Sequence, residues 1–187
     1  MRILVIDDGT EHLEAARAQL GSAHDVVLAG TYDEGRELLR GQRGFEVVLC
    51  DLLMPASGNM LGSKEGLRLV GQEMPIGIFL AILAAKNGAK YVGLLTDSDH
   101  HSHPASACLD AIQRNEGHPD AFRIEGATVV LSNCRNWIRN FDPSDLATPI
   151  AYDVAYAREK AGDSLVRAKY WPALLDRLLE GEKSAVA

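Results

Sequence analysis

The stretch VVLCDLLMP, residues 47–55, decides the fold, because an apolar run ends abruptly at one acid, Asp51. Such a run lacks polar alternation, which is typical of a strand buried on both faces of a helix-covered parallel sheet. Similar apolar, β-branched runs occupy residues 3–6, 91–95 and 128–131, and residues 25–29 form a strand nearer an edge. Five strands are therefore predicted.

Helical patterns separate these strands. They cover residues 10–20, 33–39, 64–70, 78–86 and 104–114. Strictly alternating strands and helices predict an α/β fold, with a doubly wound parallel sheet, right-handed crossovers and helices on both faces. Ligands in such folds bind at the carboxyl ends of the strands, so the residues just after each strand carry the functional information.

The segment from residue 142 onward has a different character. Asp142-Pro143 and Thr148-Pro149 punctuate it, and helical patterns follow at 150–160 and 170–179, the second with Trp171. We therefore predict a main domain over residues 1–141 and a C-terminal helical extension over 142–187. The extension either packs on the main domain or forms a homodimer or partner surface.

Composition narrows the classes of function. The 187 residues carry a formal net charge of −7 and a sequence pI of about 5.3. An acidic chain has no electrostatic reason to bind nucleic acid or an anionic membrane. The three cysteines form no CxxC pair, and no apolar run has the length of a membrane span. These features favour a cytoplasmic protein with reduced cysteines.

Acids follow three of the predicted strands. Asp7 and Asp8 end the first, Asp51 ends the third, and Thr96 with Asp97 ends the fourth. Carboxyl ends of parallel strands lie side by side, so these carboxylates would share one pocket. Their mutual repulsion calls for a hard divalent cation such as Mg²⁺.

Three segments resemble the signature segments of response-regulator receiver (CheY-like) domains of two-component signalling. They are RILVIDD (2–8), VVLCDLLMP (47–55) and GLLT (93–96). The resemblance covers about residues 1–135 and implies a five-stranded flavodoxin-like fold. It also implies that Asp51 accepts a phosphoryl group from a histidine kinase or small donor, and that Asp8, Asp51 and the Leu53 carbonyl bind Mg²⁺ with Asp7 beside them. Thr96 would contact the phosphoryl oxygen.

The sequence departs from the receiver pattern in three places, of which the first two are the end of the fifth strand and the loop after Asp51. Asn133 stands where a lysine is normal after the fifth strand, Arg135 is the nearest cation, and Val130 occupies the usual aromatic switch position. The segment 56–74 also expands the loop after Asp51, so that it either hangs over the pocket or makes a surface excursion. Regulation without phosphorylation is accordingly an alternative.

A third departure is the run DSDHHSH, residues 97–103. His100, His101 and His103 with nearby aspartates could bind a transition metal. A second hypothesis is therefore a metal-dependent enzyme on the same fold, whose site combines Asp7, Asp8, Asp51 and Asp97 with the loop of residues 100–103. A solvated polar loop ahead of the helix at Pro104, with Asp99 or Ser102 as its cap, explains the same residues. A haloacid-dehalogenase-like phosphatase is disfavoured, because Leu53 replaces its second acid. A third hypothesis is an interaction module that uses the 56–74 loop and the Trp171 helix.

Overall fold

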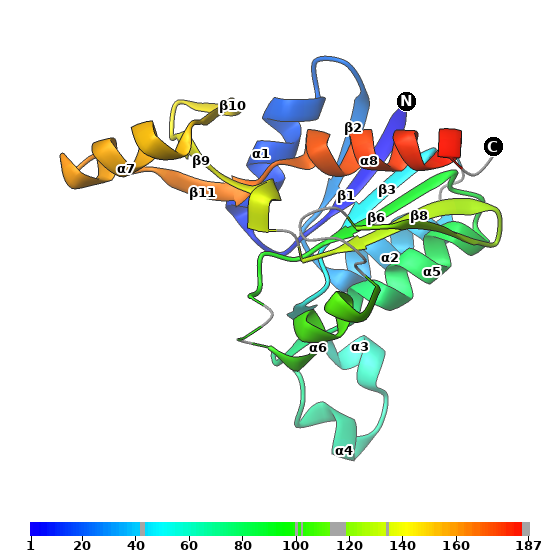
Figure 1. Cartoon of the computed structure of the whole chain (residues 1–187). Helices are drawn as coiled ribbons and strands as arrows, with labels where there is room; N and C mark the ends of the chain where they lie inside the picture. The colour runs from blue at the N-terminus through cyan, green and yellow to red at the C-terminus, as the bar shows by residue number, and fades with distance from the viewer. Residues whose placement is uncertain (42–43, 100, 102, 113–118, 134, 185–187) are drawn as a thin grey trace.

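The computed structural model describes all residues except 42–43, 100, 102, 113–118, 134 and 185–187. Its centre is a six-stranded sheet with strand order β2-β1-β3-β6-β8-β7 (Figure 1). The strands are β1 (Arg2–Ile6), β2 (Asp25–Ala29), β3 (Val47–Cys50), β6 (Tyr91–Leu95), β7 (Ala121–Ile124) and β8 (Ala127–Ser132). The first five in that spatial order are parallel.

The parallel part confirms the predicted doubly wound, five-stranded arrangement, because β2-β1-β3-β6-β8 is the flavodoxin-like strand order. The prediction missed β7, which pairs antiparallel with β8 and makes the sheet six-stranded. Glu125 and Gly126 join the two strands with φ of 49° and 85°. Two successive positive φ values are those of a tight hairpin turn.

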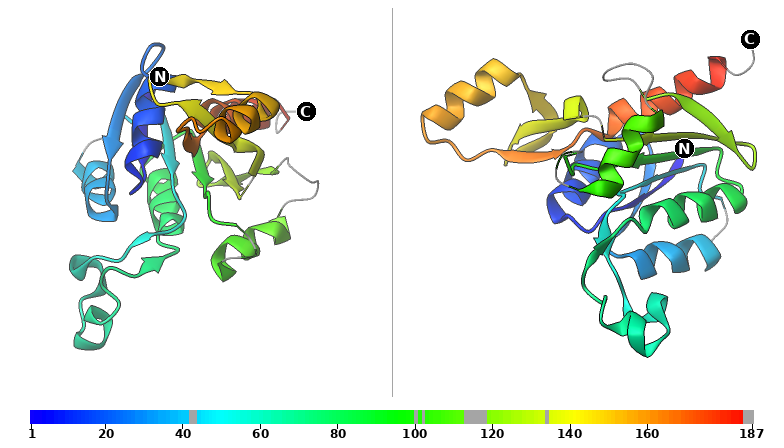
Figure 2. Two further views of the ribbon diagram at one scale, coloured as in Figure 1. Left: turned by 90° about the vertical axis from the view of Figure 1, so that its left-hand side faces the viewer. Right: turned by 60° about the horizontal axis from the view of Figure 1, so that its bottom comes forward.

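Two helices cover each face of the sheet (Figures 1 and 2). On one face lie α1 (Thr10–Leu20) and α8 (Trp171–Ser184), and on the other lie α2 (Tyr32–Gly41) and α5 (Gly77–Lys86). Each face has its own apolar core, one around Leu80 and Val92 and the other around Val5 and Leu174. Leu174 reaches the sheet over Gly93, where an added Cβ would lie 2.7 Å from the leucine.

The C-terminal segment contains the two predicted helices but is not simply helical. Between β8 and α8 the chain forms η2 (Arg135–Trp137), β9 (Ile138–Asp142), β10 (Asp145–Ile150), α7 (Tyr152–Lys160) and β11 (Val166–Lys169). The strands make a separate sheet of order β10-β9-β11, which packs on α1 through Ala15, Phe141 and Ala168. This sheet corrects the predicted helical extension, whereas the division at residue 141 stays a prediction.

The expanded loop after Asp51 forms a small excursion below the sheet in Figure 1. It comprises β4 (Met54–Pro55), α3 (Gly58–Leu61), α4 (Lys64–Leu67) and β5 (Glu73–Met74). The antiparallel pair β4–β5 returns the chain to α5. The helix predicted at 104–114 is instead α6 (Pro104–Ala107) followed by η1 (Cys108–Ile112). In the part of the chain that the structure describes, no helix is both long and apolar enough to cross a bilayer.

Candidate functional site

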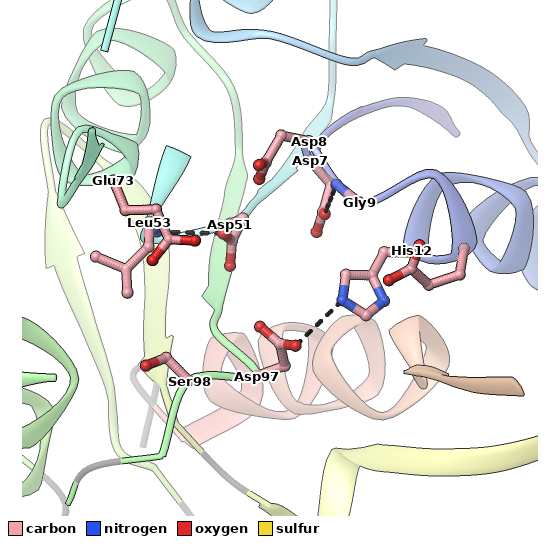
Figure 3. Close-up of a pocket in the computed structure, with 10 residues that line it drawn as sticks. Asp7, Asp8, Gly9, His12, Asp51, Leu53, Glu73, Asp97 and Ser98 are labelled. Carbon is pink, nitrogen blue, oxygen red and sulfur yellow. Dashed lines mark hydrogen bonds and ion pairs between the residues drawn. The ribbon is translucent and has the colours of Figure 1, made fainter. Parts of the chain in front are cut away.

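A pocket of about 210 Å³ opens at the carboxyl ends of β1, β3 and β6 (Figure 3). It brings together acids that are far apart in sequence, as the parallel sheet requires. Its lining residues are Asp7, Asp8, Gly9, Glu11, His12, Asp51, Leu53, Glu73, Asp97 and Ser98. The predicted acidic pocket is thus present, and it also includes Glu73 from the excursion.

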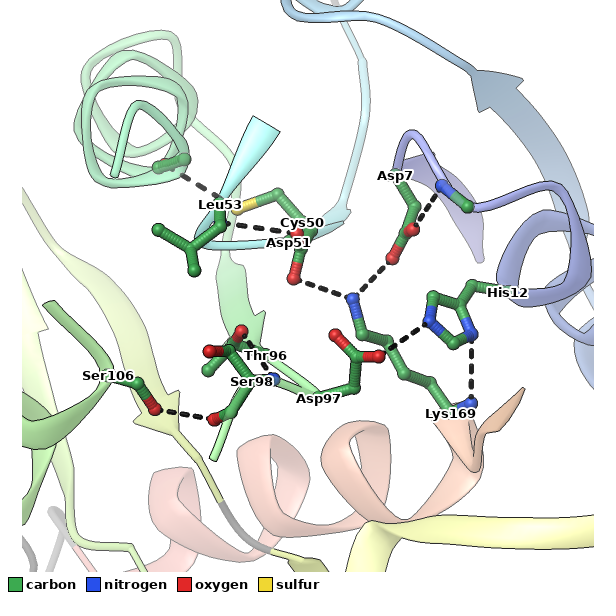
Figure 4. A network of polar contacts seen from close by, with 12 residues as sticks. Asp7, His12, Cys50, Asp51, Leu53, Thr96, Asp97, Ser98, Ser106 and Lys169 are labelled. Atoms are coloured by element: carbon green, nitrogen blue, oxygen red, sulfur yellow. Dashed lines mark hydrogen bonds and ion pairs between the residues drawn. The ribbon is translucent and has the colours of Figure 1, made fainter. Parts of the chain in front are cut away.

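A buried lysine neutralises part of this charge. Lys169 ends β11, and its Nζ donates to Asp7 Oδ2 and to Asp51 Oδ1, each at 2.6 Å (Figure 4). All three side chains are buried. The remaining carboxylate oxygens accept backbone hydrogens, since Gly9 N donates to Asp7 Oδ1 at 2.9 Å and Leu53 N donates to Asp51 Oδ2 at 3.2 Å. Both carboxylates are therefore held in fixed orientations.

Two opposing effects set the pKa values of the pocket side chains: burial disfavours their charged forms, and the ion pairs between Lys169 and the two aspartates favour them. Burial raises the pKa of Asp51 above its ordinary value, and the Lys169 ammonium opposes that rise. Burial would lower the pKa of Lys169, but Asp51 and Asp7 outweigh it and raise the pKa. The pKa of Asp8 is raised by partial burial and then by Asp7. One ammonium thus leaves the pocket with excess negative charge.

The donor chemistry fits a hard cation. Asp8 and Asp51 supply carboxylate oxygens and Leu53 lines the same pocket, and oxygen donors with a few waters are what Mg²⁺ prefers. Across the described residues, no three His, Cys, Asp or Glu side chains form a group that could hold a metal by themselves. A cation here would therefore depend on waters and a backbone oxygen as well as on the carboxylates.

His12 links the pocket to the C-terminal sheet. Its Nδ1 accepts from Lys169 N at 3.4 Å, and its Nε2 lies 3.5 Å from Asp97 Oδ2 (Figure 4). Its carbonyl accepts from Trp171 Nε1 at 2.9 Å. A hydrogen bond from His12 is the main reason that the pKa of Asp97 is lowered to about 2. His12 thereby fixes both the strand that carries Lys169 and a carboxylate on the pocket wall.

Thr96 and Gly77 are held in place near Asp51 without lining the pocket. Thr96 is buried at the end of β6, and its Oγ1 accepts from Ser98 N at 3.1 Å. Gly77 begins α5 directly behind Asp51, where an added Cβ would lie 1.8 Å from the Asp51 carbonyl oxygen. Only glycine fits there, so the backbone at the start of α5 packs directly against the backbone at the end of β3.

The residues expected near the missing lysine have other partners. Asn133 Nδ2 donates to Ser106 O and Asp110 Oδ1, both at 2.9 Å, and Arg135 pairs with Asp99. Neither Asn133 nor Arg135 is among the residues that line the pocket.

In the part that the structure describes, the histidine run does not form the metal-binding cluster of the second hypothesis. His103 Nδ1 accepts from Ala105 N at 3.1 Å and so caps α6, while His101 is exposed. His100 and Ser102 lie outside the described residues. A polar loop ahead of α6 agrees with the alternative interpretation of this run, but the cap is His103 and not Asp99.

Sequence reasoning missed Lys169 and gave His12 no role. Lys169 lies in VRAK, a short strand with nothing in its local pattern to mark a buried charge. One signal was available, since a pocket of several acids without the expected lysine requires a cation from elsewhere.

Comparison with known proteins gives a likeness of fold. A CheY-like response regulator receiver domain protein from Methanospirillum hungatei JF-1 matches with a TM-score of 0.42 and 20% identity, over 86% of this chain and 93% of that one. CheY6 in complex with the P1 domain of CheA3, from R. sphaeroides, is the subject of a second matching structure. That match has a TM-score of 0.37 and 19% identity, over 70% of this chain and 80% of that one.

No protein-family model and no curated protein matches the sequence. The likeness to CheY-like receiver domains is thus one of structure, and it extends over most of this chain. Because both TM-scores are low, neither likeness bears on the function of the site.

Proposed function

We propose that this chain is a receiver-type signalling domain in which Asp51 accepts a phosphoryl group in the presence of Mg²⁺. The observation that carries the proposal is the buried ammonium of Lys169, 2.6 Å from both Asp51 and Asp7. It supplies the positive charge that the sequence lacks at Asn133. A carboxylate paired with a fixed cation at the end of a central strand is suited to phosphoryl transfer, in which position and electrostatics do most of the work.

The transfer needs few groups. An Asp51 carboxylate oxygen forms a bond to phosphorus while the bond from phosphorus to the donor breaks, and the leaving group takes that electron pair. Lys169 stabilises negative charge on the entering phosphoryl oxygens, and the Thr96 hydroxyl, at the end of the neighbouring strand, donates to one of them. Asp8, Asp51 and the Leu53 carbonyl would hold Mg²⁺, with Asp7 beside them. The ion would supply charge neutralisation when bound.

The donor in this proposal is a cytoplasmic histidine kinase or another signalling protein. A homodimer through the C-terminal helices would have to use α7, because Trp171, Leu174 and Leu178 of α8 are buried in this chain. Tyr152 and Tyr156 of α7 are exposed. No observed contact favours the metal-dependent enzyme, because the described histidines of the 97–103 run do not reach the pocket lining.

The test is phosphorylation in vitro. The full chain is incubated with Mg²⁺ and phosphoramidate, and the intact mass is measured. We expect one added phosphoryl group, lost in Asp51→Asn and retained in Asp176→Asn, which removes an exposed carboxylate on α8. An unmodified wild-type protein, or modification that persists in Asp51→Asn, would refute the phosphoacceptor role.

A further inference from the structure

The acid that follows Thr96 is not used by the proposed transfer, although it lines the same pocket. Asp97 contributes a carboxylate to the pocket wall, facing the side occupied by Lys169 and Asp51 (Figure 4). Its charge is felt at the reacting group, since Asp97 is one of the charges that raise the pKa of Asp51. Because Asp97 and Asp51 line the same pocket, a donor that enters the pocket to reach Asp51 passes the Asp97 carboxylate.

This carboxylate is held in place and kept charged. His12 is buried, and its ring nitrogen lies 3.5 Å from Asp97 Oδ2. The other ring nitrogen is engaged by the backbone of Lys169, so the ring cannot turn away without breaking that contact. Gly9 packs on the ring, since a Cβ there would lie 2.8 Å from it. Asp97 is thus a fixed negative charge at neutral pH, beside the path to Asp51.

We propose that Asp97 is a specificity-determining residue that discriminates between phosphodonors by their charge, disfavouring free dianionic donors. The inference rests on the proposed phosphoacceptor function of Asp51. Like charges a few ångströms apart in a wet pocket repel, by roughly a threefold change in rate for each unit of donor charge. A donor delivered with compensating positive charge, such as a phosphohistidine on a basic partner surface, escapes this repulsion.

Two small phosphodonors of different charge distinguish repulsion by Asp97 from a general change in the reactivity of Asp51. Acetyl phosphate is a dianion at neutral pH, and its transfer breaks the phosphorus–oxygen bond and releases acetate with the electron pair. Phosphoramidate carries a protonated nitrogen and is one unit less negative, and its transfer breaks the phosphorus–nitrogen bond and releases ammonia. Both leave the phosphoryl group on an Asp51 oxygen. Their leaving groups differ, so each variant rate is divided by the wild-type rate with the same donor, and the two ratios are compared for the effect of donor charge.

The experiment compares phosphorylation rates of the full chain with both donors at low salt and saturating Mg²⁺. For Asp97→Asn we expect about a tenfold gain with acetyl phosphate and about a threefold gain with phosphoramidate. Asp97→Glu keeps the charge and should keep the wild-type ratio, and Asp176→Asn controls for net charge. Raising the ionic strength should shrink the gain, because salt screens the repulsion.

Each outcome decides the inference. Equal gains with both donors, no gain, or the same gains in Asp176→Asn would overturn it while leaving the phosphoacceptor role intact. A structural role for Asp97 would slow both donors in Asp97→Asn, which also contradicts the inference. If neither donor modifies wild type or Asp97→Asn, the proposed function fails and the inference fails with it.

Discussion

Lys169→Met tests how much the pocket depends on one buried charge. The substitution keeps the length of the side chain and removes an ammonium that makes two 2.6 Å contacts. Asp7 and Asp51 then stay buried without their counter-charge. Removing one partner of a buried pair costs about 3–5 kcal/mol, so we expect a loss of about 4 kcal/mol at pH 8. For a chain of this length that is a fall of roughly 10 °C in Tm.

The loss should depend on pH. Burial already raises the pKa of Asp51, and without Lys169 that pKa rises further, so the variant takes up a proton on Asp51 as the pH falls. Protonation removes the unpaired charge, and the loss should shrink to about 2 kcal/mol near pH 5.5. The assay is urea unfolding of wild type and variant at both pH values, followed by far-UV circular dichroism.

Two further variants make the result decisive. Lys86→Met removes an exposed lysine on α5 and should change stability by less than about 0.5 kcal/mol. The double variant Lys169→Met/Asp51→Asn removes both charges and should recover at least half of the loss, which a double-mutant cycle measures. A loss below about 1 kcal/mol at pH 8, or no recovery in the double variant, would refute the ion-pair reasoning.

Three other substitutions probe the surroundings of the site. Gly77→Ala places a Cβ 1.8 Å from the Asp51 carbonyl oxygen and should cost about 3 kcal/mol in urea unfolding, whereas Gly41→Ala, with nothing within 4 Å, should be nearly neutral. The lowered pKa of Asp97 contributes stability above its unfolded pKa of about 4, lost as the pH falls through about 2. Asp97→Asn should therefore be less stable than wild type by roughly 1 kcal/mol at pH 6, a figure discounted for the half-exposed side chain, and equally stable at pH 2. A stability difference that stays constant between pH 6 and pH 2 contradicts the stabilising role of the Asp97 carboxylate. Gln19→Ala removes side-chain bonds to Leu146 O, Lys169 O and Trp171 N and should cost about 2 kcal/mol with faster exchange of the Trp171 amide, while Gln72→Ala, exposed on the excursion, should do neither.

The sequence was sufficient for the parts of the fold that depend on local patterns. The five parallel strands were predicted because each is a short apolar run, and Asp7, Asp8 and Asp51 were placed together because parallel strands end at one edge. The strands of the C-terminal sheet were missed. Their side chains alternate between buried and exposed or are half exposed, as in β10, Asp145–Ile150. The turns and prolines beside them are equally typical of the loops between helices.

The positive charge of the site could not be placed from local sequence. Lys169 is 118 residues from Asp51 and 162 from Asp7, so its role arises only from tertiary packing. His12 follows Glu11 on α1 and looks like any polar helix residue, yet it is buried against the end of β11. Pocket chemistry gave the requirement for a cation, and only the structure identified which residue meets it.

The buried ammonium of the site comes from the residues just before the last helix and not from the residues that follow the fifth parallel strand. Asn133 follows β8, where the receiver resemblance places a lysine, and the chain then builds β9, β10, α7 and β11 before entering α8. Lys169 lies two residues before Trp171, the first residue of α8, whose indole donates to His12 O at 2.9 Å. The strands β9, β10 and β11 thus lie between β8 and α8 along the chain, and the same β11 backbone that pairs with β9 carries the ammonium. A change that shifts β11 must also shift the charge beside Asp51, so the C-terminal sheet is mechanically part of the site and not an appendage to it.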